Sequence, residues 1–468
     1  MMALCFLVLF ALVFTQHSES RLTQETFKNA FKNSPSNSNV DNDDGTIWAV
    51  LVAGSKHYEN YRHQADICHS YQILKRGGLS DENIIVFMYD DIAYNQQNPR
   101  QGTIINNPDG QDVYQGVPKD YTGENLTANN LLNAILGDKT AITGGTGKVV
   151  NSGPNDRIFI YYADHGGPGI LSMPNGDDIY AQDFISTLEK KYQMGTYKTM
   201  VIYVEACESG SIFDGLLSNG MNIYVTTAAN PSESSYATYC PGDSVISSEF
   251  QTCLGDLYSV SWMEDSDMRD SRSETLESQY QVVKERTAEG GSVGSHVMQY
   301  GDNELSGDPL SLYIGSSSPN SFINNQNNAT HHNTISNVDQ HEADIVYLKQ
   351  KVLRAPKGSM ERKEAQKKLE ATLTHRDQID STFQMIGKAL FGDDKGHEMI
   401  KTVRSAGKPI VDDWDCFKNL VGTYKTHCGQ LSTYGKKHMR AFANMCNAGV
   451  QQAQLAKLLS QVCVNKFN

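Results

Sequence analysis

Two short segments of the chain carry reactive side chains in positions suited to nucleophilic catalysis. Residues 161–169 read YYADHGGPG and residues 205–210 read EACESG. An imidazole that takes the proton of a nearby thiol makes that thiol a good nucleophile, so His165 and Cys207 together could attack a carbonyl carbon. Glycines beside them, Gly166 included, let backbone N–H groups stabilise the resulting oxyanion. Alone, each residue could be a structural thiol or a loop histidine; neither segment has zinc-ligand spacing, so neither a metal nor a cofactor is expected.

The surrounding elements predict an α/β domain with a mainly parallel sheet. Short apolar runs are typical of strands buried on both faces, and segments with helical periodicity separate them. The runs are residues 48–53, 84–88, 158–162, 200–204 and 223–225, and the helices are residues 64–75, 127–136 and 183–192. His165 and Cys207 each closely follow a run, and ligands of open α/β sheets bind beyond the carboxyl ends of the strands. The fold should therefore bring the imidazole and the thiol to one edge of the sheet.

The remaining segments predict export, a linker and a separate helical region. Residues 3–14 are an apolar run too short to cross a bilayer, and the small residues before position 21 suit cleavage of a signal peptide at 1–20. Polar residues 21–45 are typical of a pro-segment and residues 316–340 of a linker, with a catalytic domain at 46–315 between them. From residue 341 to 468 the pattern is helical, in helices of about 10–15 residues. No other stretch has the length and apolarity of a membrane span.

Export permits disulfides and glycosylation. Loss of the signal removes Cys5 and leaves eight cysteines, of which four crowd the C-terminal end as in a small cross-linked module. Asn125 and Asn328 begin Asn-X-Thr triplets that mark glycosylation sites, although such triplets are common by chance.

Charge is divided unevenly along the chain. Residues 341–468 hold 21 Lys and Arg against 13 Asp and Glu, whereas residues 1–340 hold 19 against 41. A basic end could bind nucleic acid, but docking of that end on the acidic part of its own chain explains both halves at once. Acid should loosen such a contact by protonating carboxylates, and salt should screen it.

The chain resembles the plant legumains, also called vacuolar processing enzymes or asparaginyl endopeptidases, a caspase-like family of cysteine peptidases. The resemblance runs from about residue 46 to 463 and rests on segments 60–66 (NYRHQAD), 87–91 (FMYDD), 164–166 (DHG), 205–210 (EACESG), 262–267 (WMEDSD) and 295–301 (SHVMQYG). It implies a caspase-like sheet flanked by helices and an all-helical pro-domain at 341–468 that covers the active site of a zymogen. It also implies self-activation at acid pH, in a protein that is delivered to the vacuole or secreted.

Position by position, the resemblance assigns roles to particular residues. It implies Cys207 as nucleophile and His165 as its base, with Asn60 supporting the histidine and Gly166 beside it. Asp164 matches an aspartate that family members can convert to a succinimide. The implied pocket for the residue before the scissile bond comprises Arg62, His63, Glu205, Ser235 and Asp256. The implied disulfides are Cys416–Cys446, Cys428–Cys463 and Cys240–Cys253.

The implied pocket suits an asparagine side chain. A primary amide has an acceptor oxygen and donor hydrogens, which an arginine on one side and carboxylates on the other would satisfy. An aspartate would face those carboxylates unfavourably unless a proton were bound, so cleavage after Asp should need a lower pH. The expected partners are proteins and peptides with an accessible Asn and the chain's own pro-domain as inhibitor, with no nucleic acid and no membrane.

Three functions stay open at this point: an Asn-specific endopeptidase, a peptide ligase in which an amine resolves the thioester, and an inactive storage or binding relative. The intact catalytic pair and pocket argue against the third. Gly167 and Pro168 have the form found in the protease members, whereas Tyr236 and Ala237 lean towards the ligases. Hydrolysis is the expected main reaction, because most members of the family are predominantly peptidases.

Overall fold

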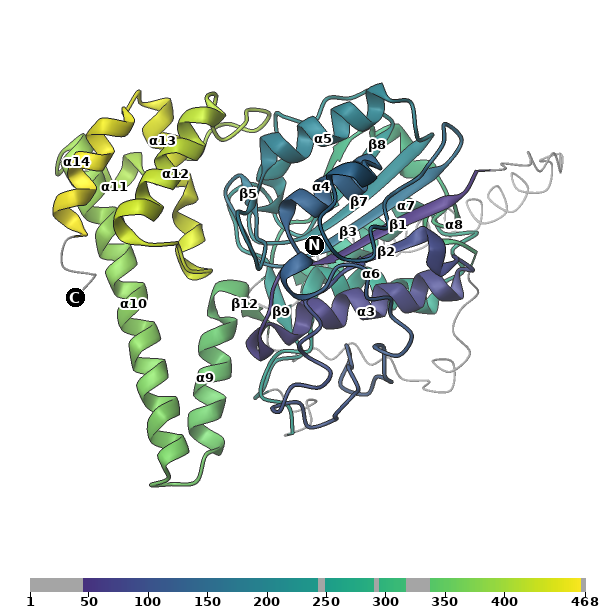
Figure 1. Cartoon of the computed structure of the whole chain (residues 1–468), viewed down its shortest axis with the longest axis horizontal. Helices are drawn as coiled ribbons and strands as arrows, with labels where there is room; N and C mark the ends of the chain where they lie inside the picture. Colours follow the sequence, from purple (N-terminus) through teal and green to yellow (C-terminus); the bar gives the residue numbers. More distant parts are fainter. Residues whose placement is uncertain (1–44, 243–248, 290–293, 317–336, 464–468) are drawn as a thin grey trace, which may run out of the picture. The chain divides into compact units, whose positions relative to one another are not determined.

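The computed structural model describes residues 45–242, 249–289, 294–316 and 337–463. The predicted signal peptide, nearly all of the pro-segment, most of the linker and the Asn328 triplet lie outside these residues. The central element is a six-stranded sheet in the order β11-β8-β7-β3-β1-β2 (Figure 1). Its strands are β1 (Ile47–Ala53), β2 (Ile84–Phe87), β3 (Arg157–Ala163), β7 (Thr199–Glu205), β8 (Ile223–Thr227) and β11 (Met298–Gly301).

The sheet is mainly parallel, as predicted. Strands β2, β1, β3, β7 and β8 pair in parallel, and only the edge strand β11 runs antiparallel to its neighbour. The side chains of β2, β3, β7 and β8 are buried throughout, which explains why the sequence shows unbroken apolar runs instead of alternation. All five predicted strands are confirmed within two residues at either end.

Helices cover both faces of the sheet (Figure 1). Alternate residues of β1 divide between two hydrophobic cores, Ala49 and Leu51 in one and Val50 and Val52 in the other. The first core includes helices α3 (Tyr61–Arg76), α6 (Leu257–Met268), α7 (Leu276–Glu289) and α8 (Ser311–Ile314). The second includes α4 (Ala128–Leu136) and α5 (Ala181–Gln193). The three predicted helices are confirmed, and α3 begins three residues earlier than predicted.

Two small sheets lie outside the central one. One consists of β4 (Gly166–Gly167), β5 (Ile170–Leu171) and β6 (Ile179–Tyr180). The other has the order β10-β9-β12 and is built from β9 (Tyr236–Thr238), β10 (Gly255–Asp256) and β12 (Val338–Asp339). The disulfide Cys240–Cys253 closes the connection between β9 and β10, as the resemblance implied.

The C-terminal region is helical, but one helix is much longer than predicted. Helix α10 (Met360–Phe391) has 32 residues, because neither proline nor glycine interrupts residues 359–386. The other elements are α9 (Ala343–Arg354), α11 (Gly396–Met399), α12 (Trp414–Cys428), the 3-10 turn η9 (Tyr434–His438), α13 (Met439–Asn447) and α14 (Gln452–Val462). Both implied disulfides are present: Cys416–Cys446 joins α12 to α13, and Cys428–Cys463 joins the ends of α12 and α14. No helix of the described residues is long and apolar enough to cross a membrane.

This helical region contacts the sheet domain through both charged and apolar groups. Ile410 and Trp414 pack over Gly169, and the rings of Tyr180 and Phe417 stand 5.8 Å apart. Basic side chains of the region meet acidic side chains near β6, in the pairs Lys436–Asp178 at 2.7 Å, Lys418–Asp183 at 2.6 Å and Lys425–Asp177 at 3.2 Å. The expected contact between the basic end and the acidic part is therefore present, but apolar packing shares in it.

A partly buried histidine holds the turn η9 in place. The ring of His438 stacks on Phe383 of α10 at 4.3 Å, and its Nε2 lies 2.8 Å from Asp380 Oδ1. Burial lowers the pKa of His438; Asp380 opposes this effect, whereas Lys437 and Lys401 reinforce it. A histidine whose folded pKa lies below its unfolded value of about 6.5 contributes stability above that pH, and the contribution is lost as the pH falls. Acid should therefore weaken η9 before most carboxylates titrate.

Hydrogen exchange should detect this weakening. In the full-length Cys207→Ala protein, we expect amide protection factors in η9 and α12 to fall as the pH drops from about 7 to about 5, and to fall further at raised salt. His438→Gln keeps a hydrogen-bond donor for Asp380 but does not titrate. In this variant the loss of amide protection should therefore begin about one pH unit lower. His375→Gln, on the exposed face of α10, is the matched control. An unchanged pH of loosening in His438→Gln would assign the effect to carboxylates alone.

Candidate active site

The carboxyl ends of β3 and β7 bring His165 and Cys207 to the same edge of the sheet. The two strands pair with Ala163 opposite Glu205, so each reactive residue lies two positions beyond this pair. Gly166 packs against the backbone of the second segment: a Cβ there would lie 2.5 Å from the carbonyl oxygen of Cys207. Only glycine fits so close an approach. The fold thus brings together the two segments singled out in the sequence.

His165 is oriented by Asn60. Its Nε2 lies 2.8 Å from Asn60 Oδ1, an acceptor, so the ring donates its N–H there. Nδ1 is buried and has no hydrogen-bond partner among the described residues. Burial lowers the pKa of His165 well below its ordinary value, and the charges of His63 and Arg62 act in the same direction. The ring is therefore neutral, with an unengaged nitrogen that can accept a proton.

Cys207 is covered in this structure. Its side chain is buried, and Sγ lies 3.8 Å from Nδ1 of His341, a residue from the C-terminal region. Burial raises the pKa of the thiol, although His341 acts in the opposite direction. The thiol is thus protonated near neutral pH as well as inaccessible, and both conditions suppress its reactivity.

The next residue, Glu208, has an unusual backbone and an unpaired side-chain atom. Its φ of 50° places a residue other than glycine in the left-handed region. Burial raises its pKa to about 7, and its Oε2 has no hydrogen-bond partner within the described part of the chain. Strained backbone of this kind is concentrated at functional sites.

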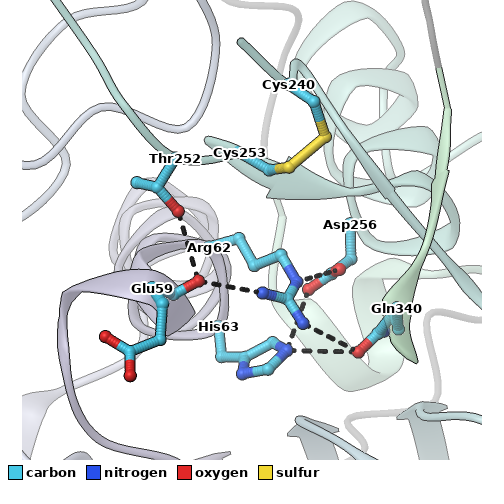
Figure 2. Close-up of a disulfide and its surroundings, with 8 residues drawn as sticks. All are labelled: Glu59, Arg62, His63, Cys240, Thr252, Cys253, Asp256 and Gln340. Carbon is cyan, nitrogen blue, oxygen red and sulfur yellow. Dashed lines mark hydrogen bonds and ion pairs between the residues drawn. A yellow bond between two sulfur atoms is a disulfide. The ribbon is translucent and has the colours of Figure 1, made fainter. Parts of the chain in front are cut away.

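A buried pocket built on Arg62 and His63 adjoins His165, whose ring centroid lies 4.9 Å from that of His63. Figure 2 shows the side chains around Arg62. Arg62 Nε lies 2.8 Å from Asp256 Oδ1, and both side chains are completely buried. His63 follows on α3, and its Nε2 lies 3.5 Å from the other oxygen of the same carboxylate. Glu205 ends β7 and accepts hydrogen bonds from the backbone N–H and the hydroxyl of Ser259 at 3.3 and 3.2 Å. Burial, together with the charge of Asp256, raises the pKa of Glu205 to about 8.

The side chain of Gln340 occupies this pocket. Its Oε1 accepts a hydrogen bond from Arg62 at 3.1 Å and lies 3.3 Å from His63 Nε2. Its Nε2 donates to Glu205 Oε1 at 3.1 Å and to Ser235 Oγ at 2.9 Å. The amide oxygen therefore faces the cation and the amide hydrogens face the carboxyl and hydroxyl groups, as expected for a bound asparagine.

The backbone before Gln340 is an added strand. β12 pairs antiparallel with β9, with Val338 opposite Ala237 and Asp339 opposite Tyr236, and the N–H of Gln340 continues the ladder. Addition of an extended segment to a sheet edge is a common mode of peptide binding. The segment therefore places the glutamine in the pocket and the residue after it beside the thiol, in the manner of a peptide substrate.

The other predicted residues lie around this centre. Asp164 is buried 3.0 Å from His63 Nδ1. Gly167 is a contact point with the helical region, because a Cβ there would lie 2.6 Å from the carbonyl oxygen of Lys436. Pro168 is buried next to it, whereas Asn125, the first predicted glycosylation site, is half-buried in a surface turn.

Two groups of donor side chains in the described residues could hold a metal ion. They are His63, Asp164 and His165, and Cys207, Glu208 and His341, each group with donor atoms within 4.8 Å of one another. Spacing along the sequence gave no sign of either, because folding assembles the donors from distant segments. In both groups a histidine nitrogen already has a partner within the protein, Ser55 Oγ at 2.7 Å from His63 Nδ1 and Asp339 Oδ1 at 3.2 Å from His341 Nδ1.

Sequence reasoning missed Gln340 and His341, which it placed at the junction of a linker and a helical region. It also missed Arg376 of α10, which donates to the carbonyl oxygen of His341, pairs with Glu342 at 2.8 Å and lies 4.3 Å from the ring of Tyr434. The available signal was an amide side chain, chemically like asparagine, just before the helical region. Nothing local distinguishes that glutamine from a solvent-exposed one.

Comparison with known proteins identifies both parts of the chain. The profile of the Peptidase C13 family matches residues 47–316, and that of the legumain prodomain matches residues 367–463. A vacuolar-processing enzyme from Citrus sinensis is 55% identical over 422 residues, which cover 90% of this chain and 85% of the relative. Legumain from Canavalia ensiformis is 51% identical over 427 residues, which cover 91% and 90%. Caspase-1 from Spodoptera frugiperda aligns with 59% of this chain and 91% of its own, at 10% identity and a TM-score of 0.33.

If the amide of Gln340 holds the cover over Cys207, its removal should expose the thiol. Gln340→Ala deletes the hydrogen bonds in the pocket, so alkylation of Cys207 by iodoacetamide should be about tenfold faster or more in the full-length protein near pH 7. Peptide mass spectrometry measures the rate, and Gln366→Ala on the exposed face of α10 is the matched control. Equal rates in the wild type and Gln340→Ala would show that the cover does not depend on the pocket.

Proposed function

The chain belongs to the Peptidase C13 family and is a cysteine endopeptidase with a legumain-type prodomain, and we propose that Cys207 is its nucleophile and His165 its general base. Cleavage takes place after asparagine, whose side chain enters the pocket of Arg62 and Glu205. Burial of the pair at one sheet edge, the neutral imidazole and the amide-filled pocket support this assignment.

In the proposed reaction, Nδ1 of His165 takes the thiol proton while Cys207 Sγ attacks the carbonyl carbon after the asparagine. Backbone N–H groups near Gly166 stabilise the oxyanion, and Asn60 holds the ring through Nε2. The C–N bond then breaks, and the imidazolium gives its proton to the leaving amine. Water attacks the thioester with the same imidazole as base, which releases the new carboxyl terminus and restores the thiol.

The observation that carries the specificity is the position of the Gln340 amide. Four groups of the pocket engage it, and each one matches either the oxygen or the hydrogens of a primary amide. Asparagine has the same amide on a side chain shorter by one methylene. With that amide in place, the carbonyl carbon of an asparagine would lie deeper in the site than the carbonyl carbon of Gln340. The glutamine thus fills the pocket as an inhibitor, while asparagine fits it as a substrate.

The same contacts make the protein a zymogen. We propose a signal peptide at 1–20, a pro-segment at 21–45, a catalytic domain at 46–315, a cleavable linker within 316–340 and a pro-domain at 341–468. Self-cleavage takes place after Asn or Asp in the pro-segment and in the linker. Relatives named vacuolar-processing enzyme indicate a vacuolar destination, and we propose a route through the secretory pathway, with substrate proteins that expose an asparagine.

The catalytic assignment is tested by single substitutions. Cys207→Ala should abolish cleavage of a fluorogenic Ala-Ala-Asn peptide and acid self-processing, whereas His165→Ala should retain about 1% or less through positioning and oxyanion contacts. Cys68→Ala is the matched control, since Cys68 is the other free cysteine among the described residues and is buried in the core. Processing that persists in Cys207→Ala, with other proteases excluded, would overturn the assignment.

The pocket predicts how the preference between Asp and Asn substrates changes with pH. Glu205, with a pKa of about 8, becomes neutral as the pH falls, so it stops repelling an aspartate side chain. The ratio of kcat/KM for Asp over Asn peptides should therefore rise from about pH 8 to about pH 4, where aspartate itself takes up a proton. Glu205→Gln is neutral throughout, so it should raise this ratio about tenfold above about pH 8, where the wild-type carboxyl group is charged, and change it little near pH 6. Glu59→Gln is the control, because its side chain points away from Arg62 (Figure 2); a ratio independent of pH in the wild type would contradict the scheme.

A second candidate function is peptide ligation, and one observation favours it. Tyr236 and Ala237, the pair that leans towards the ligases, lie on the strand that pairs with the substrate-like segment β12. Side chains there can influence how water approaches the Cys207 thioester. Gly167 and Pro168 keep the protease form, and we therefore propose hydrolysis as the main reaction.

The ratio of cyclised to hydrolysed product separates the two functions. For a peptide ending in Asn-Gly-Leu, hydrolysis should dominate near pH 4.5, and cyclisation should grow towards about pH 7.5, where more of the attacking α-amine is unprotonated. Mass spectrometry follows both products, and Ala237→Gly should lower the cyclised share. Dominant cyclisation over the whole range would make ligation the main function.

A further inference from the structure

Helix α3 carries another buried carboxyl group, Asp66, one turn after Arg62. It is completely buried and belongs to the sequence segment 60–66, yet none of the proposed roles uses it. Its Oδ1 accepts a hydrogen bond from Asn106 Nδ2 at 2.7 Å, and its carboxyl group lies within hydrogen-bonding reach of that of Asp256. Oδ2 of Asp66 and Oδ2 of Asp256 are both buried, and neither receives a hydrogen bond from any described residue.

Two buried carboxylates in contact repel each other, and each lacks a donor for one oxygen. A single shared proton removes the repulsion and satisfies both oxygens. Asp256 lies 2.8 Å from Arg62 Nε and 3.5 Å from His63 Nε2, which favours its charged form. Asp66 instead contacts a neutral amide, and burial, then the charge of Asp256, raises its pKa well above the ordinary value. The proton therefore belongs to Asp66.

Hydrogen-bond directions on the other side of Asp66 lead to the same assignment. His69 has Nε2 2.9 Å from a carboxylate oxygen of Asp267 and Nδ1 2.8 Å from Asn106 Oδ1. Both partners are acceptors, so His69 donates from both nitrogens and is positively charged; although burial opposes it, Asp267 raises the pKa of this ring. The Asn106 oxygen is thereby occupied, and its NH2 group donates to Asp66 Oδ1 and to the carbonyl oxygen of Leu254. Asn106 therefore offers Asp66 a hydrogen-bond donor but no acceptor. The protonated Asp66 must then donate its hydrogen bond to Asp256.

We propose that Asp66 remains protonated, donates a hydrogen bond to Asp256, and through it fixes Arg62 in the specificity pocket. Asp66 is a positioning residue, since it acts through Asp256 and does not touch the substrate. Its proton limits the charge beside Arg62 to one carboxylate. A second negative charge there would draw the guanidinium away from the amide oxygen that it must bind. The inference rests on the proposed function, because it concerns the pocket that selects asparagine.

The test compares two substitutions of similar size. Asp66→Asn supplies an uncharged donor to Asp256, whereas Asp66→Leu supplies none. After acid activation of the full-length protein, Asp66→Asn should keep kcat/KM for the Asn peptide within about threefold of the wild type and leave the Asn-to-Asp preference unchanged. Asp66→Leu should raise KM about tenfold or more with a smaller effect on kcat. Asp120→Asn, a buried aspartate paired with Lys148 at 3.0 Å and assigned no part in the pocket, controls for burial.

A second measurement needs no activity and does not depend on Asp66→Leu folding. Infrared difference spectra of full-length Cys207→Ala, with and without Asp66→Asn, should show near pH 6 a carboxylic-acid C=O band that the asparagine removes, two units above the usual aspartate titration. A carboxylate band in its place, or a tenfold loss of kcat/KM in Asp66→Asn, would show that Asp66 is charged and overturn the proposal. An unchanged KM in Asp66→Leu would overturn the positioning role. Wild-type protein that fails to cleave the Asn peptide would refute the proposed function instead, and the infrared result would still decide the protonation of Asp66.

Discussion

The buried ion pair between Arg62 and Asp256 is the constraint on which the site depends. Removing either partner of such a pair costs about 3–5 kcal/mol, because the other charge is left without compensation in a place that water does not reach. The two residues must therefore be held in register by separate elements. Arg62 lies in the first turn of α3, and Asp256 lies on β10, whose connection to β9 is closed by the disulfide Cys240–Cys253 (Figure 2). The pocket is consequently a rigid part of the fold, which suits the recognition of one small amide.

The same rigid pocket also keeps the precursor inactive. β12 adds a strand to β9 and inserts an amide that the pocket accepts, so inhibition needs no separate binding site. A tethered segment also acts at high effective concentration, and modest contacts are enough to keep it in place. Arg376 of α10 donates a hydrogen bond to the carbonyl oxygen of His341 and so connects this segment to the helix. Release of the strand from the pocket is therefore coupled to release of the docked helices. Cutting the chain before the strand removes the tether and leaves only the contacts.

The sequence predicted the features that depend on residues close together in the chain. Continuous apolar runs revealed the central strands because both faces are buried, and reactive residues after two runs indicated His165 and Cys207. No alternation of polar and apolar residues can appear in strands of two or three residues, such as β9, β10 and β12. Gln340 escaped detection because its partner Glu205 is 135 residues away in the sequence. The protonation of Asp66 is equally invisible, since it depends on Asp256, 190 positions later in the printed sequence.

Gly167 has a consequence for how variants of this protein are interpreted. A methyl group at this position would lie 2.6 Å from the carbonyl oxygen of Lys436, so alanine there must displace η9 or move the backbone that follows His165. One substitution at this position thus changes both the surroundings of the catalytic base and the fit of the inhibitory helical region. In the intact precursor, the effect of this substitution on the reaction products cannot be separated from its effect on premature activation. A compensating substitution in η9 would therefore be epistatic with the one at residue 167. Natural or engineered diversity at residue 167 therefore reports on latency as much as on chemistry, and the two traits are constrained to evolve together.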